Sequence, residues 1–269
     1  MTTSAIPDLP GQDRVLDALP ESTRVSIAGV WQRRARNELR TSSVFASLHR
    51  ELMAFGVELP VLALSAHAVG DELRHAELCL RVAARYSGQV ATLQPAEPVP
   101  PPSFTVCSQR VERALFAALQ SSINETLATG FLSACLDEAS GAIARHALRA
   151  LLADEVRHAR IGWAVLASPR LTAADRQVIA SFMPQLLQIC VDAWLSEEDE
   201  LESEREIPPG HGNMRSLALR ACVDDTLRTV IVPGLEHVGI ASGPAQSWVE
   251  ARERSFQSGR LFRPEAAPK

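Results

Sequence analysis

Apolar residues recur every three or four positions through most of this 269-residue chain, and glycine or proline ends most of the runs. In the first run, Ile27, Trp31 and Ala35 fall on one helical face, which is the pattern of an amphipathic helix. Residues 1–23 are polar and contain prolines, so we expect a loose lead-in there. The pattern therefore predicts an all-α chain with four long helices, over residues 25–56, 60–86, 108–137 and 142–167.

A long connector, residues 87–106, joins the second and third predicted helices. It contains five prolines from Pro95 to Pro102, which cannot support helical hydrogen bonds and favour an extended chain. The other two connections are short, so the order is helix pair, long crossover, helix pair. A linker between two independent domains would look similar, but a lone helix pair could not easily bury inward-facing polar side chains. We therefore expect one combined four-helix bundle.

Three further helical segments are predicted after Pro169. The first begins at the capping candidates Thr172 and Asp175 and runs towards residue 200, with Pro184 expected to kink it. The second covers residues 213–231, ending where Pro233 and Gly234 interrupt it, and the third covers about 244–259. We expect a single domain over 1–269, with the bundle in 25–168 and a helical extension, 170–258, packed on it. The acidic run 197–206 is expected to be a solvated helix end.

Composition narrows the functional classes. The net charge of −5 argues against nucleic-acid binding, which needs a basic face. The five cysteines never form Cys-x-x-Cys, which favours reduced thiols and gives no sign of a zinc or iron–sulfur site. The N-terminus lacks the pattern of a signal peptide, and no stretch approaches the roughly 20 apolar residues of a membrane span. We expect a soluble cytoplasmic protein that does not contact a membrane.

One five-residue pattern occurs twice, as Asp71-Glu72-Leu73-Arg74-His75 and as Asp154-Glu155-Val156-Arg157-His158. Each copy contains Glu-x-x-His, and residues three apart on a helix share a face. A carboxylate and an imidazole projecting together from each of two helices form half of a dinuclear metal site. The other two bundle helices each offer one acid on an apolar line, Glu38 and Glu125.

Six candidate metal ligands result. Four carboxylates and two imidazoles suit two iron ions, with manganese as the other choice. The alternative is a set of surface ion pairs on amphipathic helices, which would require four helices to place an acid inward by accident. Two other acids, Glu51 and Glu112, fall roughly 140° off the faces of Glu38 and Glu125 and are expected at the surface. The predicted ligands are Glu38, Glu72, His75, Glu125, Glu155 and His158.

These residues resemble the ferritin-like di-iron carboxylate superfamily, and the Asp-Glu-x-Arg-His form resembles its oxygen-activating branch of desaturases and bacterial monooxygenases. The resemblance covers residues 25–168 and implies a ferritin-like bundle with one long crossover between helices 2 and 3. It also implies that Asp71 and Asp154 accept hydrogen bonds from the metal-bound imidazoles. The family pattern favours Asp71 serving His158 and Asp154 serving His75, although spacing alone also permits pairs within one helix.

Thr129 lies one turn after Glu125 on the same face. In the enzymes that the chain resembles, a threonine near this turn is associated with oxygen activation, so Thr129 is a catalytic candidate. The alternative is a threonine that bonds its own helix carbonyl. Nearby small residues either leave a cavity for O2 or a modest substrate, or simply allow tight helix packing. They are Ala118, Ser121, Ser122, Ala128, Ala159 and Gly162.

The resemblance implies a di-iron oxidoreductase that uses O2 to hydroxylate, desaturate or N-oxidise a small organic substrate. A ferroxidase or peroxide-scavenging iron protein is the alternative, and a binding protein that keeps metal only for stability is the third reading. The chain carries no flavin or dinucleotide motif, so electrons are expected from a separate donor protein. Tyr86, the only tyrosine, is about 16 Å along its helix from His75, too far for a metal-adjacent radical. The sequence leaves the oligomeric state open and is compatible with a homodimer.

Overall fold

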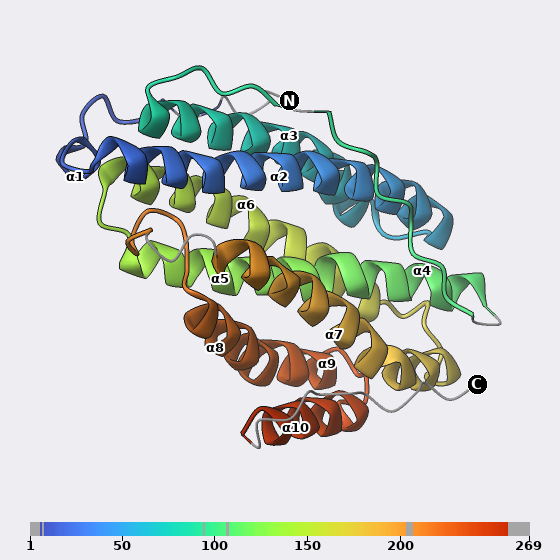
Figure 1. Ribbon diagram of the computed structural model, residues 1–269. Helices are drawn as coiled ribbons and strands as arrows, with labels where there is room; N and C mark the ends of the chain where they lie inside the picture. The colour runs from blue at the N-terminus through green and yellow to red at the C-terminus, as the bar shows by residue number, and fades with distance from the viewer. Residues whose placement is uncertain (1–5, 7, 94, 106–107, 203–206, 258–269) are drawn as a thin grey trace.

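The computed structural model describes residues 6, 8–93, 95–105, 108–202 and 207–257, without the side chains of 197–202 and 257. Every regular element in these residues is a helix, so the all-α prediction is confirmed (Figure 1). The bundle is formed by α2 (Glu21–Phe55), α3 (Leu59–Ser87), the continuous run α4 (Gln109–Ala117), η1 (Ala118–Asn124) and α5 (Glu125–Glu138), and α6 (Ala142–Leu166).

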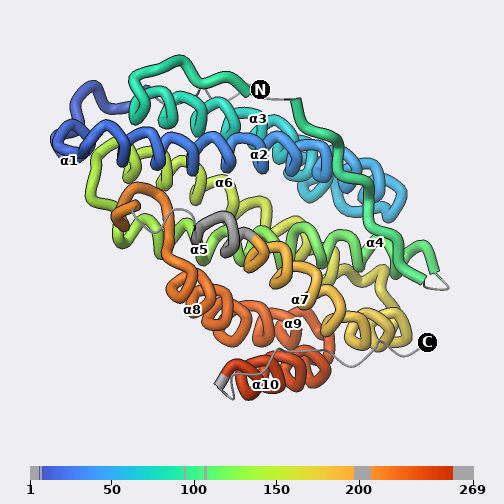
Figure 2. The backbone as a smooth tube through the Cα atoms, in the orientation of Figure 1, coloured from blue at the N-terminus to red at the C-terminus, as the bar shows by residue number. Residues whose placement is uncertain are grey.

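These long helical segments pack around one apolar core. The helix α2 lies along α3, and α6 packs against α3, η1 and α5. Trp31, Phe45 and Leu48 on α2 are completely buried, as the apolar spacing of this helix predicts. The tube view shows the crossover between α3 and α4 running along the outside of the bundle (Figure 2). The amide of Val99 in this crossover donates to Ser43 Oγ of α2 at 3.2 Å. The ferritin-like assignment itself stays a prediction.

The lead-in is more ordered than expected, because it contains a short helix, α1 (Arg14–Asp17). Asp13 caps α1 by accepting hydrogen bonds from the amides of Val15 and Leu16. Its second oxygen accepts from the amide of Ile143, 2.8 Å away, in the first turn of α6. One buried carboxylate thus satisfies free amides at the starts of two helices and ties the lead-in to the bundle.

The third bundle helix contains a π-helical segment that the apolar pattern did not reveal. The predicted helix 108–137 is divided into α4, η1 and α5, where η1 makes i→i+5 hydrogen bonds. The π-helical segment η1 ends at Asn124, directly before the predicted ligand Glu125. It packs against α6 and α7 (Ala173–Glu202), and so lies between the bundle and the C-terminal helices.

The C-terminal extension packs on the bundle through α7. Thr172 and Asp175 form the expected capping box, since each side chain accepts from the other's amide at 2.9–3.1 Å. The helix continues through Pro184. The remaining elements are α8 (Ser216–Thr226), η2 (Leu227–Ile231), α9 (Val232–His237) and α10 (Gly243–Gln257).

The predicted break at Pro233 and Gly234 is wrong, because α8, η2 and α9 form one continuous helical run. Pro233 directly follows the π-helical turn, where i→i+5 hydrogen bonding already interrupts the regular pattern that a proline would break. Gly234 serves close packing instead, since a Cβ there would lie 2.8 Å from the Trp163 ring. A glycine that admits an aromatic ring gives the same sequence signal as a glycine that ends a helix.

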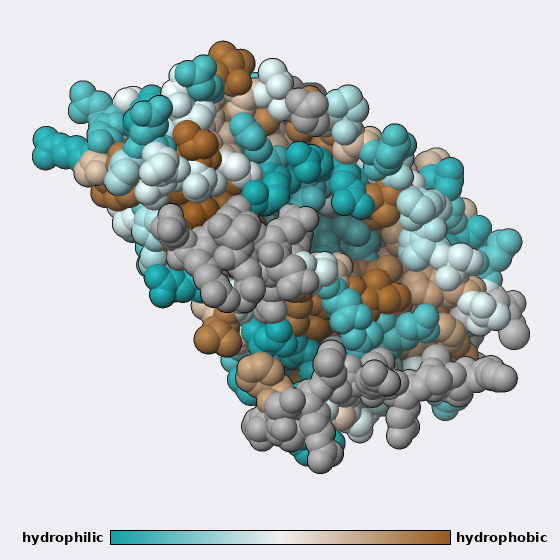
Figure 3. Space-filling view, viewed as in Figure 1, coloured by the Kyte–Doolittle hydropathy of each residue, from teal (hydrophilic) through white to brown (hydrophobic). Residues whose placement is uncertain are grey.

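By length and composition, the segment Ala173–Ser196 of α7 could cross a membrane, and it is the only such helix in the described residues. This corrects the expectation that no stretch reaches that length. Within this structure α7 packs against α4, η1, α8 and α10, and its Met183 and Leu186 side chains are fully buried. The visible face of the molecule mixes hydrophilic and hydrophobic side chains (Figure 3). The side chains of the acidic run 197–206, and Cys107, lie outside the described residues.

Candidate metal centre

The six predicted ligands meet inside the bundle. Their candidate ligand atoms form two overlapping groups, each with all its atoms within 4.8 Å of one another. The first group joins Glu38 and His75, the second joins Glu125 and His158, and both contain Glu72 and Glu155. The two shared carboxylates therefore lie between the two groups, where each could bridge a pair of cations. We define these six residues as the carboxylate–histidine cluster.

Five of these six residues are buried, with at most 3% of their surface exposed, and the Glu38 side chain is 15% exposed. Burying several carboxylates together is costly unless they are paired with protons or cations. Both oxygens of Glu72 and Nδ1 of His75 are buried without a hydrogen bond of regular geometry. Their near neighbours are other groups of the cluster, such as His158 Nδ1, which lies 3.0 Å from Glu72 Oε1. Buried donor atoms that converge on one another in this way are what a cation site requires, so these residues fit a metal pair.

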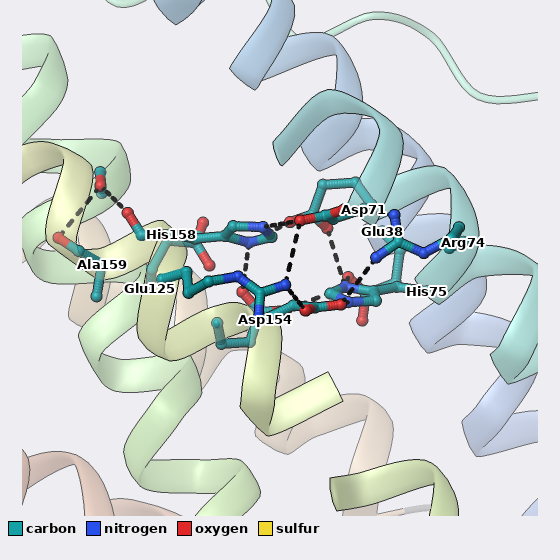
Figure 4. Close-up of polar contacts among 12 residues, drawn as sticks. Glu38, Asp71, Arg74, His75, Glu125, Asp154, His158 and Ala159 are labelled. Atoms are coloured by element: carbon teal, nitrogen blue, oxygen red, sulfur yellow. Dashed lines mark hydrogen bonds and ion pairs between the residues drawn. The ribbon is translucent and has the colours of Figure 1, made fainter. Parts of the chain in front are cut away.

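The two histidines present the same ring nitrogen to the carboxylates. His75 Nδ1 lies 3.2 Å from Glu155 and 3.7 Å from both Glu38 and Glu72. His158 Nδ1 lies 3.0 Å from both Glu72 and Glu155. Figure 4 shows the two rings reaching toward one another from α3 and α6. Both Nδ1 atoms therefore face the shared carboxylates, as metal-binding nitrogens would.

The opposite nitrogen of each ring meets an aspartate from the other helix. His75 Nε2 lies 3.0 Å from Asp154 Oδ2, and His158 Nε2 lies 3.2 Å from Asp71 Oδ2. Of the two pairings that the sequence left open, the structure adopts the one across the helix pair. An aspartate that accepts from Nε2–H leaves Nδ1 as the lone-pair nitrogen, which is the form that binds a metal.

Two arginines of the repeated motif contact these aspartates and form an arginine–aspartate layer with them. Sequence reasoning gave the arginines no role. Arg74 contacts Asp71 on its own helix and Asp154, at 3.1 Å, on the other. Arg157 contacts Asp154 on its own helix and lies 3.8 Å from Asp71. Each guanidinium thus bridges both aspartates, and Figure 4 shows Arg74 between Asp71 and Asp154. The sequence did contain a signal for these arginines, because an arginine recurs at the same place in both copies of the motif, and a residue that recurs with the candidate ligands is expected to act with them.

Burial and neighbouring charges set the protonation of the cluster. Burial raises the pKa of Glu38 to about 8 against an opposing hydrogen bond to His75. Burial, followed by the Glu155 and Glu72 carboxylates, raises the pKa of Glu125 well above its ordinary value. Burial would lower the pKa of His75, but its contacts with Asp154 and Glu155 outweigh this and raise it. Without metal the cluster therefore holds protons, which a bound cation would replace.

Polar groups of η1 and α7 hold Glu125. The Gln120 amide donates to Glu125 Oε1 at 2.6 Å, and the Asn124 amide lies 3.5 Å from the same oxygen. The indole of Trp194 on α7 donates to Asn124 Oδ1 at 2.9 Å. Sequence reasoning missed these three residues, because helical spacing of 100° per residue places Gln120 off the face of Glu125.

The small residues near the cluster serve tight packing where η1 meets α6. Ser121 Oγ donates to the carbonyl of His158 and accepts from the amide of Gly162 at 2.8 Å. The hydroxyl thus lies between two backbone groups that would bond each other in a regular helix. A Cβ on Gly162 would lie 2.5 Å from Ser122 N and Oγ. Of the two readings of these residues, close packing applies at Ser121, Ser122 and Gly162.

The structure also places the remaining candidates, which are Thr129, two further glutamates and the tyrosine. The Thr129 hydroxyl donates to the Glu125 carbonyl at 2.8 Å, which is the local contact weighed as the alternative. Its part in oxygen activation stays a prediction. Glu51 and Glu112 lie outside the cluster, as expected, and line a surface cleft beside the crossover. Tyr86 is also outside it, and its hydroxyl lies 2.9 Å from His211 Nδ1.

No match to this chain was found among protein-family models, curated proteins or solved structures.

Proposed function

We propose that this protein is an O2-dependent di-iron oxidoreductase with a ferritin-like bundle, acting on a small organic substrate. The observation that supports this most is the buried carboxylate–histidine cluster, in which four helices bring together six residues whose oxygen and nitrogen atoms could bind cations. Four carboxylates and two imidazoles, with no cysteine, suit iron or manganese. When bound, two iron ions would supply the electrons and open positions for O2 chemistry.

The protein's own residues would fix the geometry of such a centre. Glu38 and His75 would hold one ion, Glu125 and His158 the other, with Glu72 and Glu155 shared between them. Asp154 and Asp71 would keep the protons on Nε2 of the two histidines, so that both Nδ1 atoms bind metal. Arg74 and Arg157 would hold both aspartates in place.

The surrounding core would exclude water from the reacting atoms. Phe45 packs against the His158 ring with centroids 5.1 Å apart, and it is fully buried. Glu38 is the one cluster residue with appreciable exposure, so we expect small molecules to approach from its side. Electrons would come from a separate donor protein.

Anaerobic loading with Fe(II) tests the proposal. We expect two irons per chain and, on addition of O2, a transient visible absorption that decays in a single turnover. Continuous oxidation of hundreds of irons per chain would instead indicate a ferroxidase. Failure to take up iron would contradict the metal centre and leave a non-enzymatic binding protein.

A further inference from the structure

We propose that Gln120 and Asn124, aligned by the π-helix η1 and by Trp194, hold Glu125 so that it offers a single oxygen to a bound cation. This inference depends on the proposed metal centre and adds to it a positioning device from the C-terminal extension. We call Gln120, Asn124 and Trp194 the amide clamp.

The contacts of the clamp converge on one atom. Gln120 Nε2 is 2.6 Å from Glu125 Oε1, which is a short hydrogen bond to a carboxyl oxygen. Asn124 Nδ2 approaches the same Oε1 at 3.5 Å. Because these donors engage Oε1, the second oxygen, Oε2, is the one left for a cation. Glu125 itself is 3% exposed, so water does not replace the amides.

The π-helix makes this contact feasible. Residues five apart in an α-helix point about 140° away from each other, at roughly 100° per residue. In η1 the hydrogen bonds run from i to i+5, so residues five apart lie about one turn apart along the axis. Gln120 lies within η1, and Glu125 follows its last residue. The local widening therefore places the amide above the carboxylate.

Trp194 fixes the orientation of the Asn124 amide. Its indole N–H donates to Asn124 Oδ1 at 2.9 Å, so the Asn124 NH2 group must face the other way, toward Glu125. The Trp194 ring packs on Phe131, with centroids 5.5 Å apart, which restrains the indole. The extension thereby reaches the cluster through a chain of two contacts.

Glu38 is the corresponding acid of the other half, and the described residues give it no comparable amide contact. Glu38 lies in the uninterrupted α-helix α2, and its cluster contact is His75 at 3.7 Å. Glu38 is therefore free to offer both oxygens, whereas Glu125 offers one. A cation at the Glu125 half would keep an open coordination position, as catalytic metal sites do. In this proposal, an exogenous ligand that enters beside Glu38 would bind the cation at the Glu125 half.

Cobalt(II) is a suitable probe, because its visible absorption weakens as coordination number rises. The protein would be titrated anaerobically with Co(II) as wild type, Gln120→Met and Trp194→Phe. Trp163→Phe is the control. The Trp163 indole on α6 donates to the hydroxyl of Thr126, which lies on the same helix as Glu125, and not to the Asn124 amide. We expect Gln120→Met to bind one of two ions several-fold more tightly, with weaker absorption, because Oε1 is released to chelate. Trp194→Phe should shift the same ion less, and Trp163→Phe should match wild type.

The outcomes separate this inference from the proposed function. A wild type that binds no Co(II) would overturn the metal centre and the clamp together. Two bound ions with unchanged spectra and affinities in folded Gln120→Met would overturn the clamp alone. If Gln120→Met does not fold, Trp194→Phe decides in the same way, because it retains an aromatic ring and loses only the donor.

Discussion

The two halves of the cluster carry the same ligand types in different surroundings. On the α2–α3 side, Glu38 is 15% exposed and lies in a regular helix. On the η1–α6 side, Glu125 is 3% exposed, follows a π-helix and is held by Gln120. The motif repeat builds a symmetric centre of aspartates, arginines and histidines. The asymmetry comes from the helices that supply the single glutamates.

The two halves therefore hold their histidines in the same way and their single glutamates in different ways. The shared layer of Asp71, Asp154, Arg74 and Arg157 sets the histidine orientation equally in both halves. The half that contains Glu125 is closely packed, since η1 and α6 approach too closely for a side chain at Gly162. The half with Glu38 is the more exposed of the two. The following predictions test the symmetry of the centre first and its asymmetry afterwards.

The largest effect is expected from removing either histidine. His75→Ala and His158→Ala should each lose one of two bound ions, with affinity at that position reduced by more than about 100-fold. Even outer partners of metal ligands are worth 10–100-fold. Metal counting after equilibrium dialysis checks this. His49→Ala is the control, because His49 bonds Ser65 outside the cluster; a loss of metal in this variant would contradict the assignment.

A smaller and equal effect is expected at the two aspartates. Asp71→Asn and Asp154→Asn should each weaken metal binding by about 10–100-fold, because each replaces the charged acceptor that sets a histidine tautomer by a neutral amide, which can also turn its NH2 group toward the ring. Competition with a chelator measures both. If one variant lost affinity and the other behaved as wild type, the arginine–aspartate layer would not be shared as the structure indicates.

The sequence predicted the six residues of the carboxylate–histidine cluster because each interrupts an apolar helical face. It also predicted the end of α2 and the starts of α3 and α6, because Gly56, Pro60 and Gly141 mark them. It missed the start of α2 at Glu21, which falls inside the predicted lead-in. It did not reveal η1, since a π-helix depends on tertiary contacts such as the Ser121 bridge to α6. For the same reason it missed Gln120 and Trp194. The break expected at Gly234 failed because close packing against Trp163 requires the same residue.

Packing in the two halves is expected to respond in opposite directions to one added methyl group. Gly162→Ala should destabilise the protein by about 3 kcal/mol, because its Cβ would overlap the carbonyl oxygen of Ala117 and the amide nitrogen of Ser122, and backbone atoms move only at a cost. Gly70→Ala, on α3, meets nothing within 4 Å and should stabilise by about 0.5–1 kcal/mol through helix propensity. Urea unfolding of the metal-free protein measures both, and equal effects would contradict the asymmetry.

A still smaller effect concerns acid stability. Burial opposes ionisation of Asp71, but hydrogen bonds from His158 and Arg74 outweigh it and lower the pKa to about 2, from an ordinary 3.8. The resulting stability, on the order of 2 kcal/mol, is present above pH 3.8 and lost as pH falls through about 2. Metal-free Asp71→Asn should therefore show a flatter decline of unfolding free energy between pH 4 and 2, followed by circular dichroism. Parallel curves would contradict the assigned contacts.

The central claim is that two cations share the buried cluster, and diffraction tests it most directly. Crystals loaded with Fe(II) without O2 would be measured at the iron absorption edge. We predict two anomalous peaks per chain, one between Glu38 and His75 and one between Glu125 and His158, with Glu72 and Glu155 reaching both. Iron bound only at surface carboxylates, or no peak inside the bundle, would contradict the account.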